Sequence, residues 1–314
     1  MRRLFVLGVI LMASVLATAW TNLKAQQPAA GQGREAGPGR GAAQGVGVIQ
    51  KVAGNVYMIP GAGGNTAAYV TANGVVLVDT KLANNGQAIL DQVKTVSDKP
   101  ITHIINTHTH GDHNGSNQFF PASVEIVVQE NTQKNMQKMP VFQEEANKHG
   151  LPDRTYTDRM TLLRGDESID LFYFGKAHTD GDTFVLFRNA RVLHTGDAFA
   201  NRGQPNIDLM NGGSGVAYPD TLAKAASTIK NVDTIIAGHN AALLKHEDLV
   251  NQAEFTRLML TKAREAVKAG RTPEQAMMEF QTTLPAKFKD YNLAPGRGGP
   301  GGAFVPLFEE LKQK

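Results

Sequence analysis

The chain has 314 residues, of which 41% are hydrophobic and 19% charged, so it can bury a substantial core and is not disordered by composition. Residues 1–25 carry the whole positive excess: without Arg2, Arg3 and Lys24, the 32 basic residues fall to 29 and equal the 29 acidic ones. This balance gives no electrostatic case for a nucleic-acid partner. The absence of cysteine excludes disulfides and thiolate metal ligands.

The N-terminal segment is typical of an export signal. Two arginines precede the apolar run 4–20, and Leu23-Lys24-Ala25 offers a small residue at a cleavage point. We therefore predict a signal peptide at residues 1–25 and a periplasmic or secreted protein. Retention of the same segment as a membrane anchor is the alternative, and the only route by which we expect a membrane partner.

Residues 26–45 are rich in Gly, Ala, Pro and Gln and nearly devoid of large apolar side chains. Such a segment cannot bury enough surface to fold, so it predicts a flexible linker.

The middle of the chain alternates between strand-like and helix-like patterns. Short apolar runs predict strands at residues 46–52, 56–59, 67–71, 75–78, 101–106, 124–128 and 234–237, with three more within 168–195. Amphipathic spacing predicts helices at residues 84–96, 130–149 with a break at Pro140, 219–230 and 247–269. Strand-rich halves closed by helices indicate a layered α/β body with the sheets inside.

The C-terminal end differs in composition. Residues 294–303 (APGRGGPGGA) precede a short amphipathic tail, 304–314, which either docks as a helix or extends freely. We divide the chain into a signal peptide (1–25), a linker (26–45), a main domain that includes the C-terminal helices (46–290) and a Gly/Pro-rich segment with the tail (291–314).

Histidine and aspartate residues follow the ends of the predicted strands. The densest group is residues 105–115, INTHTHGDHNG, and the others are Asp79, His178, Asp197 and His239. Polar residues at strand ends are the usual arrangement for a site on a rigid scaffold.

Imidazole and carboxylate groups are the ligands that zinc takes where no thiolate is available. The candidate metal ligands are five histidines and two aspartates: His108, His110, Asp112, His113, His178, Asp197 and His239. A structural zinc site closes with four ligands, so seven suit two metal ions with an open position between them. We interpret His103, His149, His194 and His246 as structural, and Asp180 and Asp182 as turn formers.

Two glycine-rich segments stay open to interpretation. Residues 61–65 (GAGGN) are either a loop that covers substrate or an ordinary connection. Residues 211–215 (NGGSG) carry the same ambiguity, and no P-loop lysine accompanies them.

The ordered motifs resemble those of the metallo-β-lactamase-fold superfamily. THTHGDH is similar to its HxHxDH motif, and VVLVDT, GKAHTDGDT, HTGDAF and AGHN match four others in chain order, over residues 46–241. The resemblance implies a four-layer αββα sandwich with two metals at one edge of the paired sheets.

The resemblance also implies roles for the matched residues. His108, His110 and His178 would bind one metal, Asp112, His113 and His239 the other, and Asp197 would bridge them as in glyoxalase-II-like members. Asp79 would orient a ligand rather than bind metal. Asp112 is the candidate proton carrier and thus the candidate catalytic side chain. The substrate-binding residues stay unknown.

The implied reaction is hydrolysis by a zinc-dependent enzyme in which a metal-bound hydroxide attacks a carbonyl. Two departures from the β-lactamase pattern bear on the substrate. Asp197 stands where many β-lactamases have Cys, and Ala200 stands where they have a Lys that binds the carboxylate of the drug. We expect two Zn²⁺, with iron or manganese as alternatives, and a small-molecule substrate: a cyclic amide such as a β-lactam, an ester or lactone, or a thioester. The alternative function is an iron-dependent redox member of the fold, similar to a sulfur dioxygenase.

Overall fold

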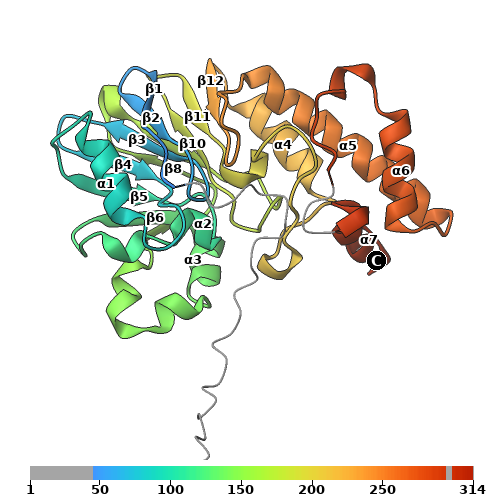
Figure 1. The fold of residues 1–314 in the computed structure, drawn as a ribbon, viewed down its shortest axis with the longest axis horizontal. Helices are drawn as coiled ribbons and strands as arrows, with labels where there is room; N and C mark the ends of the chain where they lie inside the picture. The colour runs from blue at the N-terminus through green and yellow to red at the C-terminus, as the bar shows by residue number, and fades with distance from the viewer. Residues whose placement is uncertain (1–44, 295–298, 314) are drawn as a thin grey trace, which may run out of the picture. The chain divides into compact units, whose positions relative to one another are not determined.

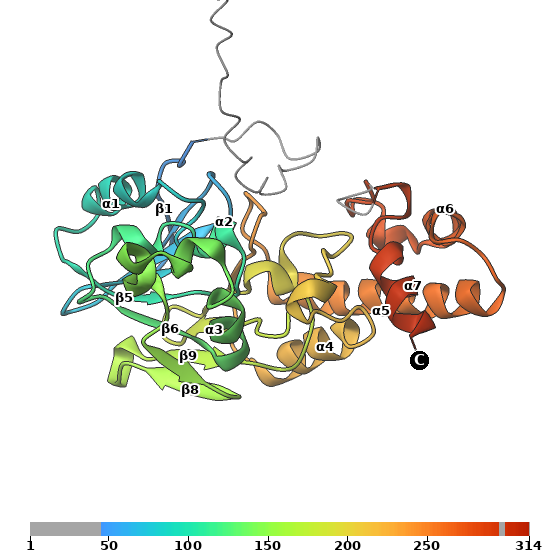
Figure 2. The same ribbon diagram turned by 90° about the horizontal axis from the view of Figure 1, so that it is seen from below.

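The computed structural model describes residues 45–294 and 299–313 (Figures 1 and 2). The predicted signal peptide, residues 1–25, lies outside these residues, and so does the predicted linker 26–45 except for Gly45. Within the described ranges, no helix is both long and apolar enough to cross a membrane.

The first sheet has seven strands in sequence order, in which β1 to β4 are antiparallel and β4 to β7 parallel. Its strands are β1 (Gln50–Ala53), β2 (Val56–Ile59), β3 (Thr66–Val70), β4 (Val75–Val78), β5 (Ile101–Ile105), β6 (Glu125–Gln129) and β7 (Arg154–Tyr156).

The second sheet has five strands in the order β12-β11-β10-β9-β8, antiparallel except for the parallel pair β11 and β12. Its strands are β8 (Arg159–Leu162), β9 (Ile169–Phe172), β10 (Phe184–Phe187), β11 (Val192–His194) and β12 (Thr234–Ile236).

Alternating side chains place each sheet between two apolar layers. On β4, Val76 and Val78 face the second sheet, whereas Val75 and Leu77 face the helices on the outer side. On β10, Val185 and Phe187 face the first sheet and Phe184 and Leu186 face outward. Successive side chains of a strand point to opposite faces, so strands that are apolar throughout must be covered on both sides.

The helices provide those outer covers (Figure 1). Helices α1 (Gly86–Lys94) and α3 (Glu130–Met136) cover the first sheet through side chains such as Ile89 and Met136. The second sheet is covered by α4 (Tyr218–Thr228) and α5 (His246–Lys268), and α6 (Pro273–Thr283) and α7 (Phe304–Lys312) pack against α5 (Figure 1). The expected αββα sandwich is therefore confirmed.

Several elements differ from the sequence-based expectation. The helix expected over 130–149 ends at Met136 and is followed by short 3₁₀ turns. Strands β7 and β8 and helix α6 were not predicted. The tail, for which two outcomes were open, forms α7, whose Phe304, Leu307 and Phe308 are buried in the core. The remaining short helices are α2 (Gly111–Asn114), η1 (Asn117–Phe119), η2 (Pro140–Gln143), η3 (Glu145–Gly150), η4 (Gly165–Glu167), η5 (Gly196–Phe199), η6 (Leu209–Asn211), η7 (Ala286–Phe288) and η8 (Gly299–Gly301).

Candidate metal centre

The candidate site lies where the carboxyl ends of strands from both sheets meet. Asp79 follows β4, and the histidine-rich segment follows β5 and leads into α2. In the second sheet, β9, β11 and β12 run in the same direction, and His178, Asp197 and His239 follow their ends. All seven ligand candidates thus come from segments that follow strand ends at one edge of the sandwich.

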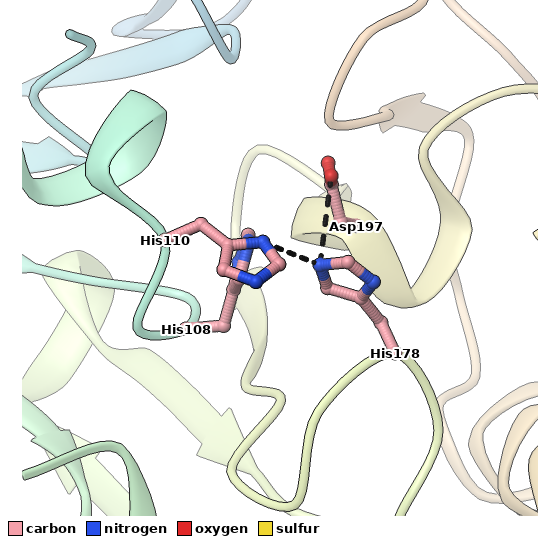
Figure 3. A group of neighbouring side chains, drawn as sticks. All are labelled: His108, His110, His178 and Asp197. Atoms are coloured by element: carbon pink, nitrogen blue, oxygen red, sulfur yellow. Dashed lines mark hydrogen bonds and ion pairs between the residues drawn. The ribbon is translucent and has the colours of Figure 1, made fainter. Parts of the chain in front are cut away.

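The candidates form two neighbouring groups. In the first, one donor atom from each of His108, His110, His178 and Asp197 lies within 4.8 Å of the others (Figure 3). In the second, Asp112, His113 and His239 are equally close together. These are the sets that the resemblance assigned to the two metals.

Asp197 lies between the groups. Its Oδ1 is 3.3 Å from Nε2 of His113 and 3.2 Å from Nε2 of His239, whereas its Oδ2 is 3.7 Å from Nε2 of His178. One carboxylate oxygen therefore faces each group, which is the geometry that a bridging ligand requires.

In the first group, His110 and His178 each have one ring nitrogen that points away from the group and one that points into it. The hydrogen bond at the outward nitrogen decides whether the inward nitrogen carries a proton. His110 meets the Oδ2 of Asp208 through Nε2 at 2.7 Å, and His178 meets the carbonyl oxygen of Asn206 through Nδ1 at 2.7 Å. Both partners are acceptors, so both outward nitrogens must donate a proton. In the neutral rings, Nδ1 of His110 and Nε2 of His178 then carry lone pairs, and they face each other at 2.9 Å. Two facing lone pairs repel unless a cation lies next to them.

Two further rings, those of His113 and His108, are oriented by Asp79. Its Oδ2 lies 2.7 Å from Nδ1 of His113 and accepts a hydrogen bond from Thr107 Oγ1, which in turn lies 3.0 Å from Nδ1 of His108. Both Nδ1 atoms therefore donate, and both Nε2 atoms face inward. Within the described part of the chain, Nε2 of His108 is buried with no hydrogen-bond partner. A buried acceptor in this state fits a metal ligand.

Burial and neighbouring charges shift the pKa values of the histidines in opposite directions in the two donor groups. Burial, followed by the neighbouring His110, lowers the pKa of His178 to about 4, and burial also holds the pKa of His108 well below its usual range. These rings are neutral at physiological pH, which is the state that binds metal.

The second group behaves in the opposite way. Burial would lower the pKa of His113, but Asp197 and Asp79 raise it well above its usual range, and Asp197 likewise raises the pKa of His239 against burial. The surrounding carboxylates thus favour positive charge at the nitrogens that face inward. A metal cation would replace these protons.

The glycine-rich segment 61–65 is held against the centre. A Cβ on Gly64 would lie 2.2 Å from Cε1 of His113, so only glycine allows the backbone to approach the ring this closely. Asn65 donates from Nδ2 to the carbonyl oxygens of Ala237 (2.8 Å) and Asn240 (2.7 Å), on either side of His239. The segment therefore lies against the ligand candidates, and its coverage of a substrate stays a prediction.

Lys81 anchors the same loop and was missed by the sequence analysis. It is fully buried, and its Nζ donates to the carbonyl oxygens of Ile59 (2.7 Å), Gly61 (2.8 Å) and Gly64 (3.0 Å). A lysine beside an apolar strand carries no sequence signal for such a role.

Asp208, Asn206 and Thr107 were also missed. Thr107 is adjacent to His108 and could have been suspected from that position, but Asp208 is separated from His110 by 98 residues. Burial alone would raise the pKa of Asp208, but its hydrogen bonds with His110 and Asn211 lower it.

Two of the residues that we interpreted as structural, His194 and Asp182, have hydrogen bonds that fit this interpretation. His194 is fully buried, with Nε2 3.0 Å from the carbonyl oxygen of Asn65 and Nδ1 accepting from the amide of Gly196. Asp182 accepts from the amide and hydroxyl of Thr179, as a turn former does.

Comparisons with known proteins agree with this geometry. The family model described as "Metallo-beta-lactamase superfamily" matches residues 59–239. The chain is 32% identical over 140 residues to "Uncharacterized protein YobT" of Bacillus subtilis (strain 168), an alignment that covers 42% of this chain and 60% of that protein. It is 24% identical over 179 residues to metallo-beta-lactamase IND-1 of Chryseobacterium indologenes, covering 56% of this chain and 71% of that protein.

Two solved structures share the fold. The DIM-1 metallo-beta-lactamase superposes with a TM-score of 0.58 at 16% identity, over 69% of this chain and 99% of that chain. The inverting sec-alkylsulfatase Pisa1 from Pseudomonas sp. superposes with a TM-score of 0.69 at 13% identity, over 84% of this chain and 50% of that chain. This chain thus spans less than two thirds of YobT and half of the sulfatase. Since the family model covers more than half of the chain and ends at the last residue of the second donor group, this chain belongs to the metallo-beta-lactamase superfamily.

Proposed function

We propose that this protein is an exported dizinc hydrolase acting on the carbonyl group of a cyclic amide such as a β-lactam, of an ester or lactone, or of a thioester. The observation that carries the proposal is the pair of adjacent donor groups in which His110, His178 and His113 each direct one ring nitrogen to an acceptor outside the groups and the other nitrogen into them. Membership of a superfamily of hydrolase-like proteins supports it.

In this proposal His108, His110 and His178 bind one ion, Asp112, His113 and His239 bind the other, and Asp197 bridges the two. Histidine and carboxylate donors suit zinc and also iron or manganese. When bound, two divalent ions supply a water-derived nucleophile near neutral pH and polarise the carbonyl under attack.

The chain's own residues hold and orient the reacting groups. Asp79 and Asp208 keep the imidazoles in one tautomer, and the segment 61–65 closes one side of the centre. Asp112 has its Oδ2 3.3 Å from Nε2 of His239 and 3.9 Å from Nε2 of His113, so its carboxylate reaches the inner edge of the second group. From this position it accepts the proton that the nucleophile loses and returns it to the leaving group.

The identity of the metal needs a direct test. The same donor set, which contains no thiolate, would also hold iron, and iron would suit a redox reaction similar to that of sulfur dioxygenases. Elemental analysis of the purified protein is expected to find about two zinc ions per chain, the number that the seven ligands suit. Iron at that stoichiometry, with visible absorption and dioxygen uptake in the presence of a thiol substrate, would favour the redox function instead.

A substrate screen tests the hydrolase function. Metal-free protein and protein reloaded with zinc are assayed on a β-lactam, a lactone, a thioester and, because a sec-alkylsulfatase shares the fold, a secondary alkyl sulfate. We expect zinc-dependent turnover of one carbonyl substrate. Turnover of none of them after zinc reloading would refute the hydrolase proposal, and turnover of the sulfate alone would replace the carbonyl class.

Export is part of the proposal and rests on residues 1–25. Cell fractionation followed by N-terminal sequencing is expected to find the protein outside the cytoplasm and beginning at Gln26. A protein of full length in the membrane fraction would mean that the segment is kept as an anchor.

A further inference from the structure

The segment that supplies the outward partners of His110 and His178 is the loop between η5 and α4, residues 200–217. It carries Asp208 and the carbonyl of Asn206, so two of the three histidines of the first group depend on its position. Asp208 also receives hydrogen bonds from within the loop, from the amides of Met210 and Asn211. A shift of this loop would therefore move both imidazoles.

The outer side of this loop is fixed by the C-terminal segment. Glu310 on α7 accepts from the hydroxyl of Ser214 at 2.6 Å through Oε1 and from the amide of Val216 at 3.1 Å through Oε2. Ser214 is 7% exposed, and its hydroxyl also accepts from the amide of Ala217, the residue before α4. One carboxylate of the tail thus holds the end of the loop.

Packing and a second polar contact hold the same segment. A Cβ on Gly215 would lie 2.5 Å from Leu307 of α7, so the helix contacts the loop backbone directly. Gln204 donates to the carbonyl of Leu293 and accepts from the amide of Ala303, both at 2.8 Å. Inward, the amide of Ser214 donates to the carbonyl of Ala177, next to His178, at 3.0 Å.

We propose that Glu310 is a positioning residue for the metal centre, acting through the Ser214–Val216 turn on the loop that orients His110 and His178. The C-terminal helix is then part of the metal site's architecture, although none of its residues reaches the metal. The fixed amide of Val216 needs an acceptor, and Oε2 of Glu310 supplies it at 3.1 Å.

The inference rests on the proposed metal-binding role of His110 and His178, and cobalt binding tests the two separately. Metal-free protein is titrated with Co²⁺ alone, its visible absorption is followed, and the two binding steps are fitted separately. We expect Glu310→Ala to weaken binding at the group of His108, His110 and His178 by roughly three- to tenfold, since loss of a ligand's direct partner costs about ten- to a hundredfold and Glu310 lies further out. Binding at the group of Asp112, His113 and His239 should stay unchanged.

Two variants serve as matched controls. Glu309→Ala removes the neighbouring exposed carboxylate of α7 and should bind cobalt as the wild type does. Glu310→Gln keeps an acceptor for Val216 and turns its amide towards the Ser214 hydroxyl, which can accept, so it should restore most of the affinity. Titrations are run where circular dichroism shows each metal-free variant to be folded.

Equal cobalt binding by the wild type and by folded Glu310→Ala would overturn the inference while leaving the metal centre intact. Equal weakening of both steps would overturn it as well, because Glu310 would then act on the fold as a whole. Absence of cobalt binding by the wild type would overturn both this inference and the proposed function. If Glu310→Ala does not fold, Ser214→Ala tests the inference in its place, because it removes the contact with Oε1 of Glu310 and leaves α7 unchanged. Wild-type cobalt affinity in Ser214→Ala refutes the inference, and weakening at the group of His108, His110 and His178 alone supports it.

Discussion

Asp79 and His113 are both fully buried, and the Oδ2 atom of the carboxylate lies 2.7 Å from Nδ1 of the imidazole. The same carboxylate accepts from the amide of Thr107 at 2.7 Å and from its hydroxyl at 2.8 Å, and that hydroxyl meets His108. One carboxylate therefore sets the tautomer of a histidine in each of the two donor groups.

Replacing Asp79 by Asn tests this relationship. Three donors then compete for one oxygen, while the new amide N–H₂ faces groups that also donate. The backbone is not the cause of any effect, because Asp79 has φ of 65° and Asn tolerates this conformation. We expect zinc affinity at both groups to fall by roughly ten- to a hundredfold, measured by competition with a chromophoric chelator.

The exposed Asp98→Asn is the control for Asp79→Asn and should leave zinc affinity unchanged. If Asp79→Asn binds both ions as tightly as the wild type, the carboxylate has no role in orienting the ligands.

Asp197→Ala tests the bridging assignment. Burial would raise the pKa of Asp197, but His239 and His113 hold it well below its usual range, so the group is a carboxylate in the folded protein. Its loss removes the oxygens that face both groups. We expect bound zinc to fall from two ions to about one and kcat/KM to fall by the order of a hundredfold or more, with an unchanged far-UV circular dichroism spectrum. A variant that keeps both ions and the full rate would show that Asp197 does not bridge.

Asp112→Asn separates proton transfer from metal binding. Burial would raise the pKa of Asp112, but His113 and His239 hold it well below its usual range, so its carboxyl group is ionised. It can accept a proton only when the positive charge next to it is reduced. Measured at saturating zinc, the variant is expected to lose about 10²- to 10⁴-fold in kcat, the usual contribution of a general acid–base group. A change in zinc affinity with kcat retained would make Asp112 a ligand only.

The sequence could predict that the ligand candidates meet at one place, because they follow the ends of strands. Asp79, His108 and Asp197 each follow a short apolar run, and carboxyl ends of strands that run in the same direction meet at one edge of a sheet. Asp208 and Asn206 were not predictable, because the loop that carries them has no periodic pattern. Its path depends on contacts with residues far along the chain, such as Asn292.

The missed elements of the fold have local explanations. Strands β7 and β8 are short, partly exposed and begin with arginine, so they lack the apolar run that marks strands such as β2 and β4. Helix α6 did carry a signal: Thr272 accepts from the amide of Gln275, whose side chain accepts from the amide of Thr272, with Pro273 at the first turn. Such a capping box marks a helix start and was overlooked.

Lys81→Met tests how the loop 61–65 is held. The methionine keeps the apolar length of the side chain but leaves the carbonyls of Ile59, Gly61 and Gly64 without their donor. We expect the free energy of unfolding, measured with urea on metal-free protein, to fall by about 3 kcal/mol, since buried acceptors without partners cost roughly 1–3 kcal/mol each. The exposed Lys94→Met should change it little. An equal loss in both variants would mean that the three hydrogen bonds contribute nothing specific.

The same lysine predicts a dependence of stability on pH. Burial lowers the pKa of Lys81 from 10.5 to about 7, partly opposed by Asp79. Between these values the unfolded chain binds a proton that the folded chain does not, so the free energy of unfolding rises with pH from about 7 to 10.5 and is independent of this group below 7. At about 1.4 kcal/mol per pKa unit the full effect is of the order of 5 kcal/mol. Urea unfolding is measured on metal-free wild type and on metal-free Lys81→Met at a series of pH values. The free energy of unfolding of the wild type should rise relative to that of Lys81→Met as the pH increases across this range. A constant difference would mean that the ammonium stays charged, with its three carbonyl partners offsetting the cost of burial.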